Sequence, residues 1–204
     1  MTNSAPYEVI GGGAVSVYVA VDTAIPTYPA LDEAPAALDW ALIGLNGAKN
    51  YGEDGLTIRH PQTITPYRSL GATGTSKNFR ENEDLEFEFM LFDMTAESYA
   101  RALGKDPADI VDTAAGVGSP GDRELELLRG FVIPTRSLLV RFDMSPYGED
   151  FVMQWEIPMA QSIGVPEPVY TKGTPMGHQM IFRTLEHPSL GFGVCRMQDA
   201  VPTA

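Results

Sequence analysis

The segment Leu85–Phe92, LEFEFMLF, constrains the fold of this chain more than any other stretch. Large apolar residues at positions 85, 87, 89 and 91 alternate with Glu86 and Glu88, and a period of two residues is typical of a β-strand. The following residues, Thr95–Leu103, begin with a favourable N-cap and stop before Gly104, so they predict a short helix. The sequence therefore predicts a strand that runs directly into a capped helix.

Most other periodic segments also predict strands. The 20 glycines and 16 prolines favour many short elements joined by turns, and MSPYGED at 144–150 is typical of a hairpin turn. Residues 60–82, by contrast, show no clean period and contain Pro61 and Pro66, so they predict a long irregular loop. The expected strands are Ala14–Val21, Leu56–His60, Glu124–Ile133, Arg136–Asp143, Phe151–Ile157 and His178–Glu186.

These elements predict a mainly β fold, an antiparallel β-sandwich or barrel with one flanking α-helix. We expect one domain over residues 14–187, with a flexible N-terminal arm over residues 1–13 and a C-terminal tail over residues 188–204. The predicted strand at 85–92 carries large apolar side chains on both faces, since Met90 and Phe92 lie opposite the buried set. Such side chains are covered either by the helix or by another subunit.

The net charge of −13 argues against ordinary nucleic-acid binding. The 14 lysines and arginines are spread singly and are outnumbered by 27 acidic residues, whereas a DNA-binding surface is basic. The acidity serves either solubility or a more specific purpose. The longest apolar stretch, Gly11–Val21, is too short to span a bilayer, and Cys195 is the only cysteine, so no internal disulfide can form. We expect a soluble protein, made in a cytoplasm, with no membrane insertion.

No pattern in the chain predicts catalysis, a cofactor or a bound metal. The three histidines, His60, His178 and His187, are far apart and lie in no metal-ligand spacing. The sequence GVGSPG at 116–121 formally matches a dinucleotide-binding pattern, but Pro120 prevents the turn into a helix that this pattern needs. We therefore expect that the protein is not an enzyme.

Several features occur in a fixed order between Gly11 and Gly104. A glycine-rich start leads into a strand (GGGAVSVYVAV), a Trp is followed by an Ile-Gly pair (DWALIG), and an acidic-Gly turn leads into a second strand (EDGLTI). A long irregular loop, the strand LEFEFMLFD and the helix TAESYARALG come next. This order resembles that of siphophage major tail proteins, the tail tube proteins. The long Ala- and Pro-rich segment between Val21 and Trp40 departs from the pattern.

The resemblance implies a structural subunit of a bacteriophage tail. Six copies would close into a ring, and rings would stack into a tube that conducts DNA during ejection without binding it specifically. The implied partners are further copies of the chain and the tape-measure, tail-terminator and baseplate or tail-tip proteins. The implied location is the virion tail, assembled in the cytoplasm of the host bacterium.

Two groups of residues are candidates for roles in such a tube. Glu86 and Glu88, and as a second pair Glu124 and Glu126, are candidates for acidic residues that face the lumen, because each pair points to one face of a predicted strand. A solvated outer face explains each pair equally well. The loop over residues 65–82 is the candidate ring-stacking segment. Its basic residues are Arg68, Lys77 and Arg80.

Two other classes of function stay open. Another virion structural protein, such as a tail terminator or a capsid-decorating protein, would form closed rings or trimers but no long tubes. A small-molecule-binding β-barrel would have a defined pocket and would stay monomeric at high concentration.

Overall fold

The structure, a computed structural model, describes residues 14–71, 73–148 and 150–201. It is mainly β, with antiparallel sheets and one α-helix, so the predicted fold class is confirmed. Eight strands form the main sheet, in the order β2-β1-β9-β10-β11-β6-β3, with β12 beside β10. These strands are β1 (Val15–Ala20), β2 (Trp40–Leu42), β3 (Tyr51–Arg59), β6 (Glu86–Leu91), β9 (Thr135–Phe142), β10 (Met153–Ser162), β11 (His178–Thr184) and β12 (Val194–Met197).

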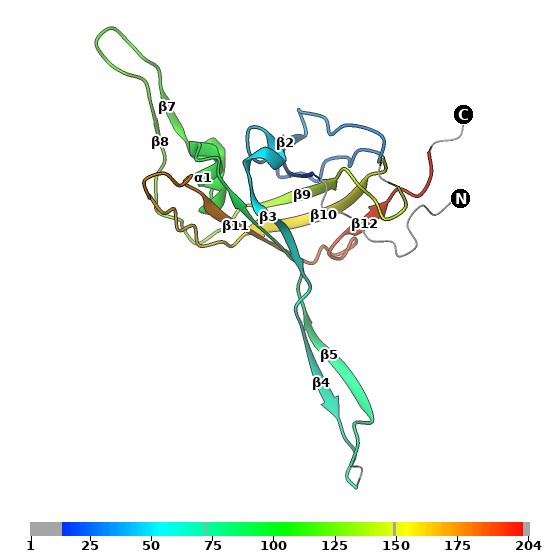
Figure 1. Cartoon of the computed structure of the whole chain (residues 1–204). Coiled ribbons are helices and arrows are strands. Elements are labelled where there is room, and N and C mark those ends of the chain that lie inside the picture. Colours follow the sequence, from blue (N-terminus) through cyan, green and yellow to red (C-terminus); the bar gives the residue numbers. More distant parts are fainter. Residues whose placement is uncertain (1–13, 72, 149, 202–204) are drawn as a thin grey trace.

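Two hairpins stand outside the main sheet and project from the body in different directions (Figure 1). One joins β4 (Gln62–Tyr67) to β5 (Lys77–Glu83), and the other joins β7 (Val111–Thr113) to β8 (Asp122–Glu124). The α-helix, α1 (Ala96–Ala102), follows β6 closely. Two short 3-10 helices, η1 (Gly47–Asn50) and η2 (Pro107–Asp109), lie in connections.

The side chain of Tyr51 brings the two ends of the main sheet together. Tyr51 starts β3 at one end of the strand order, and its hydroxyl donates to the carbonyl of Ile43, just after β2 at the other end, at 2.8 Å. The same hydroxyl accepts from the backbone N–H of Val17 in β1 at 3.1 Å. The sheet therefore curls so that its first and last strands meet, which gives the molecule its sandwich-like form.

The alternation in β6 fills the space inside the curled sheet. Phe87, Phe89 and Leu91 are buried, with exposed fractions of 2% or less. Phe89 stacks on Phe182 of β11 at 6.4 Å between ring centroids and meets Tyr51 at 4.8 Å. Burial of these large rings is the main stabilising term for such a core, because each removes a large apolar area from water.

The Ala- and Pro-rich segment 21–39 covers part of the opposite face of the sheet. Arg141 of β9 donates to the carbonyls of Leu31 and Glu33, and Gln154 of β10 donates to the carbonyl of Pro29. The segment is therefore anchored over β9 and β10 by side chains that satisfy its backbone.

The helix α1 has the ends that its sequence predicts. The Thr95 hydroxyl accepts from the Ser98 N–H at 3.2 Å, and Gly104 follows with a φ of +71°. A side chain at Gly104 would be strained by this φ, and its Cβ would also lie 3.0 Å from the Ser162 carbonyl oxygen.

Four local expectations differ from the structure. Residues 60–82 form most of a β-hairpin in place of the expected irregular loop. Its strands β4 and β5 pair although the sequence shows no period there, and the Tyr67 and Phe79 rings pack together across them. Of the predicted strand Glu124–Ile133, only Glu124 lies in a strand. The expected turn at Asp54-Gly55 is an irregularity inside β3, where Gly55 adopts a φ of +67° and the register shifts.

The last difference concerns the C-terminal segment. The expected tail over residues 188–204 contains β12, which pairs with the first half of β10. The predicted arm over residues 1–13 lies outside the described residues.

Candidate assembly surfaces

The β4–β5 hairpin is the longer of two hairpins in the described chain whose strands are exposed at every residue. Every residue in both of its strands is exposed, and Figure 1 shows that the hairpin extends well away from the body. A two-stranded hairpin on its own is only marginally stable in water, because neither face is buried. The element therefore presents two unpartnered faces.

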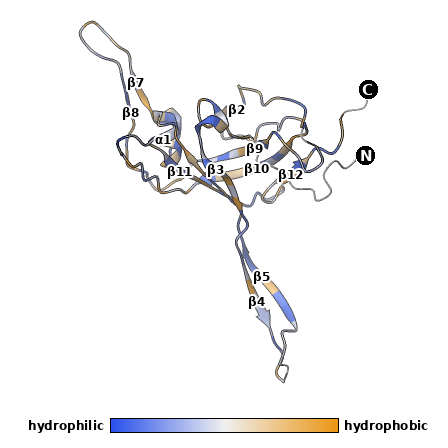
Figure 2. Ribbon diagram, in the orientation of Figure 1, coloured by the Kyte–Doolittle hydropathy of each residue, from blue (hydrophilic) through white to orange (hydrophobic). Residues whose placement is uncertain are grey.

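One face of the hairpin is aromatic. Tyr67 and Phe79 pack edge to face at 6.5 Å between ring centroids, and the Lys77 ammonium lies 5.1 Å from the centre of the Phe79 ring. About half of each aromatic side chain is exposed, and Ile64 on the other face is similarly exposed. In Figure 2 the hairpin is mostly hydrophilic, with hydrophobic patches on its strands. Large exposed apolar groups on a projecting element are typical of a surface that another molecule covers.

The structure places all three predicted stacking residues on this hairpin, but in two different settings. Arg68 and Lys77 lie near the tip, and the Arg68 Nε donates only weakly to the Thr75 hydroxyl at 3.4 Å. Arg80, in contrast, forms an ion pair with Glu83 at 2.8 Å nearer the body. Two of the three cations are therefore free of acidic partners within the described chain.

The base of the hairpin is acidic. A groove of about 580 Å³ lies where the hairpin joins the body, and its walls carry Glu81, Glu83, Asp84 and Glu186, with Phe192 at one side. Phe192 packs partly against the hydrophobic core. We call this feature the acidic groove.

The first predicted lumen pair, Glu86 and Glu88, shares the outward face of β6 as expected. Each carboxylate is neutralised by an arginine on a neighbouring strand. Glu86 accepts two hydrogen bonds from Arg183 of β11, at 2.8 and 2.6 Å, and Glu88 forms an ion pair with Arg59 of β3. This face is therefore charge-balanced, whereas the sequence predicted an acidic one.

The second predicted pair does not share a strand. Glu124 is the last residue of β8, and Glu126 lies beyond that strand, where its carboxylate is 3.5 Å from the Lys105 ammonium. The two-residue alternation therefore does not place these carboxylates on one face.

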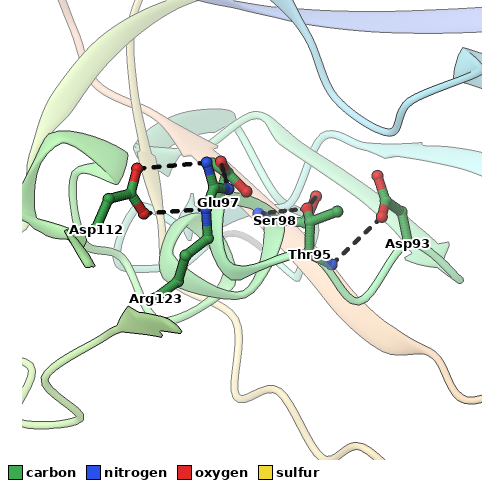
Figure 3. A network of polar contacts seen from close by, with 6 residues as sticks. All are labelled: Asp93, Thr95, Glu97, Ser98, Asp112 and Arg123. Atoms are coloured by element: carbon green, nitrogen blue, oxygen red, sulfur yellow. Dashed lines mark hydrogen bonds and ion pairs between the residues drawn. The ribbon is translucent and has the colours of Figure 1, made fainter. Parts of the chain in front are cut away.

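A polar network ties the β7–β8 hairpin to the start of α1 (Figure 3). Arg123 of β8 pairs with Asp112 of β7 at 3.0 Å and with Glu97 in the first turn of the helix. Backbone N–H groups at the helix start, together with Arg123, hold the pKa of Glu97 below its usual value. On the other side of the turn, Asp93 accepts from the N–H of Thr95 and from the N–H of Leu45.

The apolar segment that follows the β7–β8 hairpin is largely exposed in the single subunit. Residues 127–133, LLRGFVI, leave Phe131 fully exposed and Leu128 and Val132 about three-quarters exposed or more. The Arg129 guanidinium anchors this segment through a hydrogen bond to the Gly164 carbonyl at 2.8 Å. We call residues 127–133 the apolar strap. The sequence showed its composition but not its exposure, since it was expected to be a strand.

A partly enclosed cavity of about 230 Å³ lies between η2, the end of β1 and the ends of β10 and β11. Its walls are mostly apolar and include Val19, Ala160 and Phe182, with Arg101 and Arg136 at its edge. Burial lowers the pKa of Arg101, while the nearby Asp106 carboxylate opposes that shift.

The described residues contain neither a candidate metal site nor a candidate membrane-spanning helix. No group of three or more His, Cys, Asp or Glu side chains there is arranged to hold a metal ion. In the same ranges, no helix is both long and apolar enough to cross a membrane.

Comparisons with known proteins give little further information. No family model matches the sequence, and no curated protein matches it. A chain in a 6-fold symmetrised cryo-EM structure of the anti-feeding prophage baseplate is similar to this protein in structure. Its TM-score is 0.40 and its sequence identity is 11%, over 96% of this chain and 94% of that chain. At this level the likeness establishes neither a shared fold nor a shared function.

Proposed function

We propose that this protein is a structural subunit of a bacteriophage tail tube, in which copies form stacked rings, hexameric by resemblance, around a DNA-conducting lumen. The observation that carries the proposal is the β4–β5 hairpin, which projects from the body with every strand residue exposed. The order of sequence features shared with siphophage tail tube proteins points the same way. Tape-measure, tail-terminator and baseplate or tail-tip proteins would be its other partners in the virion.

The hairpin suits contact between successive rings. It needs a second surface to cover Ile64, Tyr67 and Phe79, because exposed hairpins gain little stability alone. A contact between an extended arm and a different surface of the next copy is head to tail, and such contacts repeat without closing. Repetition of that contact grows a filament.

Other surfaces suit contact within a ring. The main sheet ends at β3, which has no strand partner on its outer side among the described residues. An unpaired edge invites pairing with another chain unless something covers it. The apolar strap adds Leu128, Phe131 and Val132, which a neighbouring subunit would remove from water.

We propose that the outward face of β6 lines the lumen. Glu86 and Glu88 on that face are offset by Arg183 and Arg59. A wall of paired charges has no net attraction for phosphates, so DNA would gain nothing by releasing counterions at it. DNA would therefore pass along this wall without binding to it.

The cavity near η2 favours a second candidate, a small-molecule-binding β-barrel. Its 230 Å³ and mostly apolar walls fit a small apolar ligand. This alternative predicts a protein that stays monomeric at high concentration and is stabilised by the ligand.

Deletion of Gly71–Ser76 tests the role of the hairpin. This change removes the loop between Leu70 and Lys77 but leaves both strands and the body, so we expect a folded subunit that forms no tubes. A matched control deletes Gly116–Gly118 from the β7–β8 loop, which is exposed and outside the proposed stacking contact. Normal tubes from the first deletion would contradict the stacking role.

The proposal gives the chain no catalytic step. We expect purified protein to contain no stoichiometric metal and to hydrolyse no ester, phosphate or glycoside substrate. Elemental analysis that found one transition metal per chain would contradict this.

A further inference from the structure

The charges of the β4–β5 hairpin are separated along its length. The tip carries Arg68 and Lys77 and no acidic residue between them. The acidic groove at the base carries Glu81, Glu83, Asp84 and Glu186. Among the residues that the structure describes, only Glu83 of these four forms an ion pair, with Arg80. One end of the element is therefore cationic and the other anionic.

Each of these two ends also presents a large apolar side chain. Leu70 stands fully exposed at the tip, between the two cations. Phe192 lines the acidic groove and is only partly covered by the core beneath it. A leucine flanked by cations is thus the chemical complement of a phenylalanine flanked by carboxylates.

These two surfaces cannot meet within one chain. Gln62 at the groove begins β4, and Leu70 lies beyond the other end of that strand, so the extended strand holds the two apart. Figure 1 shows the hairpin extended away from the body, with its tip far from its base. The complement of each surface must therefore come from another molecule.

We infer that the hairpin tip of one copy docks in the acidic groove of a second copy. The inference rests on the proposed function and names the partner surface of the stacking hairpin. Arg68 and Lys77 meet the groove carboxylates, and Leu70 covers Phe192. Because tip and groove are different patches of the same chain, the contact is head to tail and propagates from copy to copy.

Paired charge reversals test this contact. The tip variant is Arg68→Glu with Lys77→Glu, and the groove variant is Glu81→Lys with Glu186→Lys. The tip variant places two glutamates against the groove carboxylates, and the groove variant places two lysines against the cationic tip. Like charges brought together in this way are strongly unfavourable at an interface. We expect each to need at least about tenfold more protein than the wild type to form tubes, a change equivalent to about 1.4 kcal/mol.

An equimolar mixture of the two variants should assemble again. The acidic tip of the first variant meets the two introduced lysines of the second, and the basic tip of the second meets the acidic groove of the first. Tubes should then contain both variants in equal amounts, as measured with two different labels. Control variants with the same charge changes on exposed residues elsewhere, Lys49→Glu with Lys172→Glu and Asp32→Lys with Glu167→Lys, should assemble like the wild type.

The outcomes separate this inference from the proposed function. Wild-type-like assembly of either variant alone, or a mixture that forms no complex in sedimentation although both proteins are folded, would overturn the tip–groove contact. If the wild type forms no tubes but the two variants still bind each other, the contact stands and the tail tube proposal fails.

Discussion

At the residue scale, Tyr51 makes long-range contacts that the alternation of apolar and polar residues does not predict. Its ring packs on Phe89, and its hydroxyl serves both Val17 and Ile43. Burial raises its pKa above that of a free tyrosine, which is consistent with a hydroxyl held in a dry, fully bonded position. A single hydroxyl inside an otherwise apolar core thus links β3 to β1 and to the residue that follows β2.

Tyr51→Phe should destabilise the subunit by about 1–3 kcal/mol, because it leaves one buried N–H and one buried carbonyl without their partner. Urea unfolding of disassembled subunits measures this loss. Tyr170→Phe is the matched control, since Tyr170 is largely exposed and should change the unfolding free energy little. Equal stability of Tyr51→Phe and wild type would show that the two ends of the sheet are held by packing alone.

His178 gives the fold a sensitivity to acid. The side chain is buried between β11 and α1, with its Nδ1 3.0 Å from the Met94 sulfur and its ring against Tyr99, and Asp93 is the nearby charged group. Burial lowers its pKa below the ordinary value of 6.5, and a hydrogen bond with the Ser98 backbone and the charge of Asp93 only partly oppose this. The unfolded chain therefore takes up the proton at a higher pH than the folded chain.

Stability from neutral His178 is fully present above pH 6.5 and is lost as the pH falls through that value and below. We expect the unfolding free energy of the wild type to fall between pH 7 and pH 5, and His178→Gln to remove part of that fall. His60→Gln, at an exposed position, should leave the pH dependence unchanged. An identical pH profile for His178→Gln and wild type would rule out this source of acid sensitivity.

At the element scale, the charge on the outward face of β6 leads to a prediction about DNA ejection. Glu86→Gln with Glu88→Gln leaves Arg59 and Arg183 unbalanced and makes the face basic, whereas Arg59→Gln with Arg183→Gln makes it acidic. Among variants that still form tubes, the basic face should slow DNA ejection and the acidic face should not, because only the basic one binds phosphates. Equal ejection by both would remove this face from the lumen.

The apolar strap should matter for association and not for the fold of one subunit. Leu128→Ser with Phe131→Ser removes side chains that are already exposed, so the unfolding free energy of the isolated subunit should change by less than about 0.5 kcal/mol. The same variant should need more protein to assemble, because it loses apolar burial between subunits. A large loss of subunit stability would instead show that the strap supports the fold.

The sequence predicts elements well where one face is buried, as in β6 and α1, because burial imposes the alternation and caps fix the helix ends. It fails where both faces are exposed. The β4–β5 hairpin has no buried side and so no period to detect, although Tyr67 and Phe79 define it in three dimensions. The strand predicted over the apolar strap is wrong for the converse reason, because its apolar composition suggests burial whereas most of its side chains are exposed in the subunit.

The candidate assembly surfaces could also be predicted only in part from the sequence. The shared face of Glu86 and Glu88 follows from the period of two, but their arginine partners lie on β3 and β11, which are distant in sequence. The acidic groove likewise joins residues 81–84 to Glu186. Contacts of this kind depend on sheet order, which local sequence patterns do not specify.

At the scale of the whole molecule, the chain combines a closed core with surfaces that are incomplete alone. The curled sheet buries its aromatic centre, while the projecting hairpin, the strap and the free edge of β3 all lie outside it. In the proposed tube, these surfaces would be covered only by neighbouring subunits. We expect the net charge of −13 to oppose aggregation of the free subunit until those contacts form.

The most direct measurement is electron microscopy of the pure protein over a range of concentrations. Above a threshold concentration we expect long hollow tubes built of stacked rings, with no other protein required. Single closed rings or trimers at every concentration would instead indicate a terminator or a capsid-decorating protein. A protein that stays monomeric at the highest concentration would contradict the tail tube function itself.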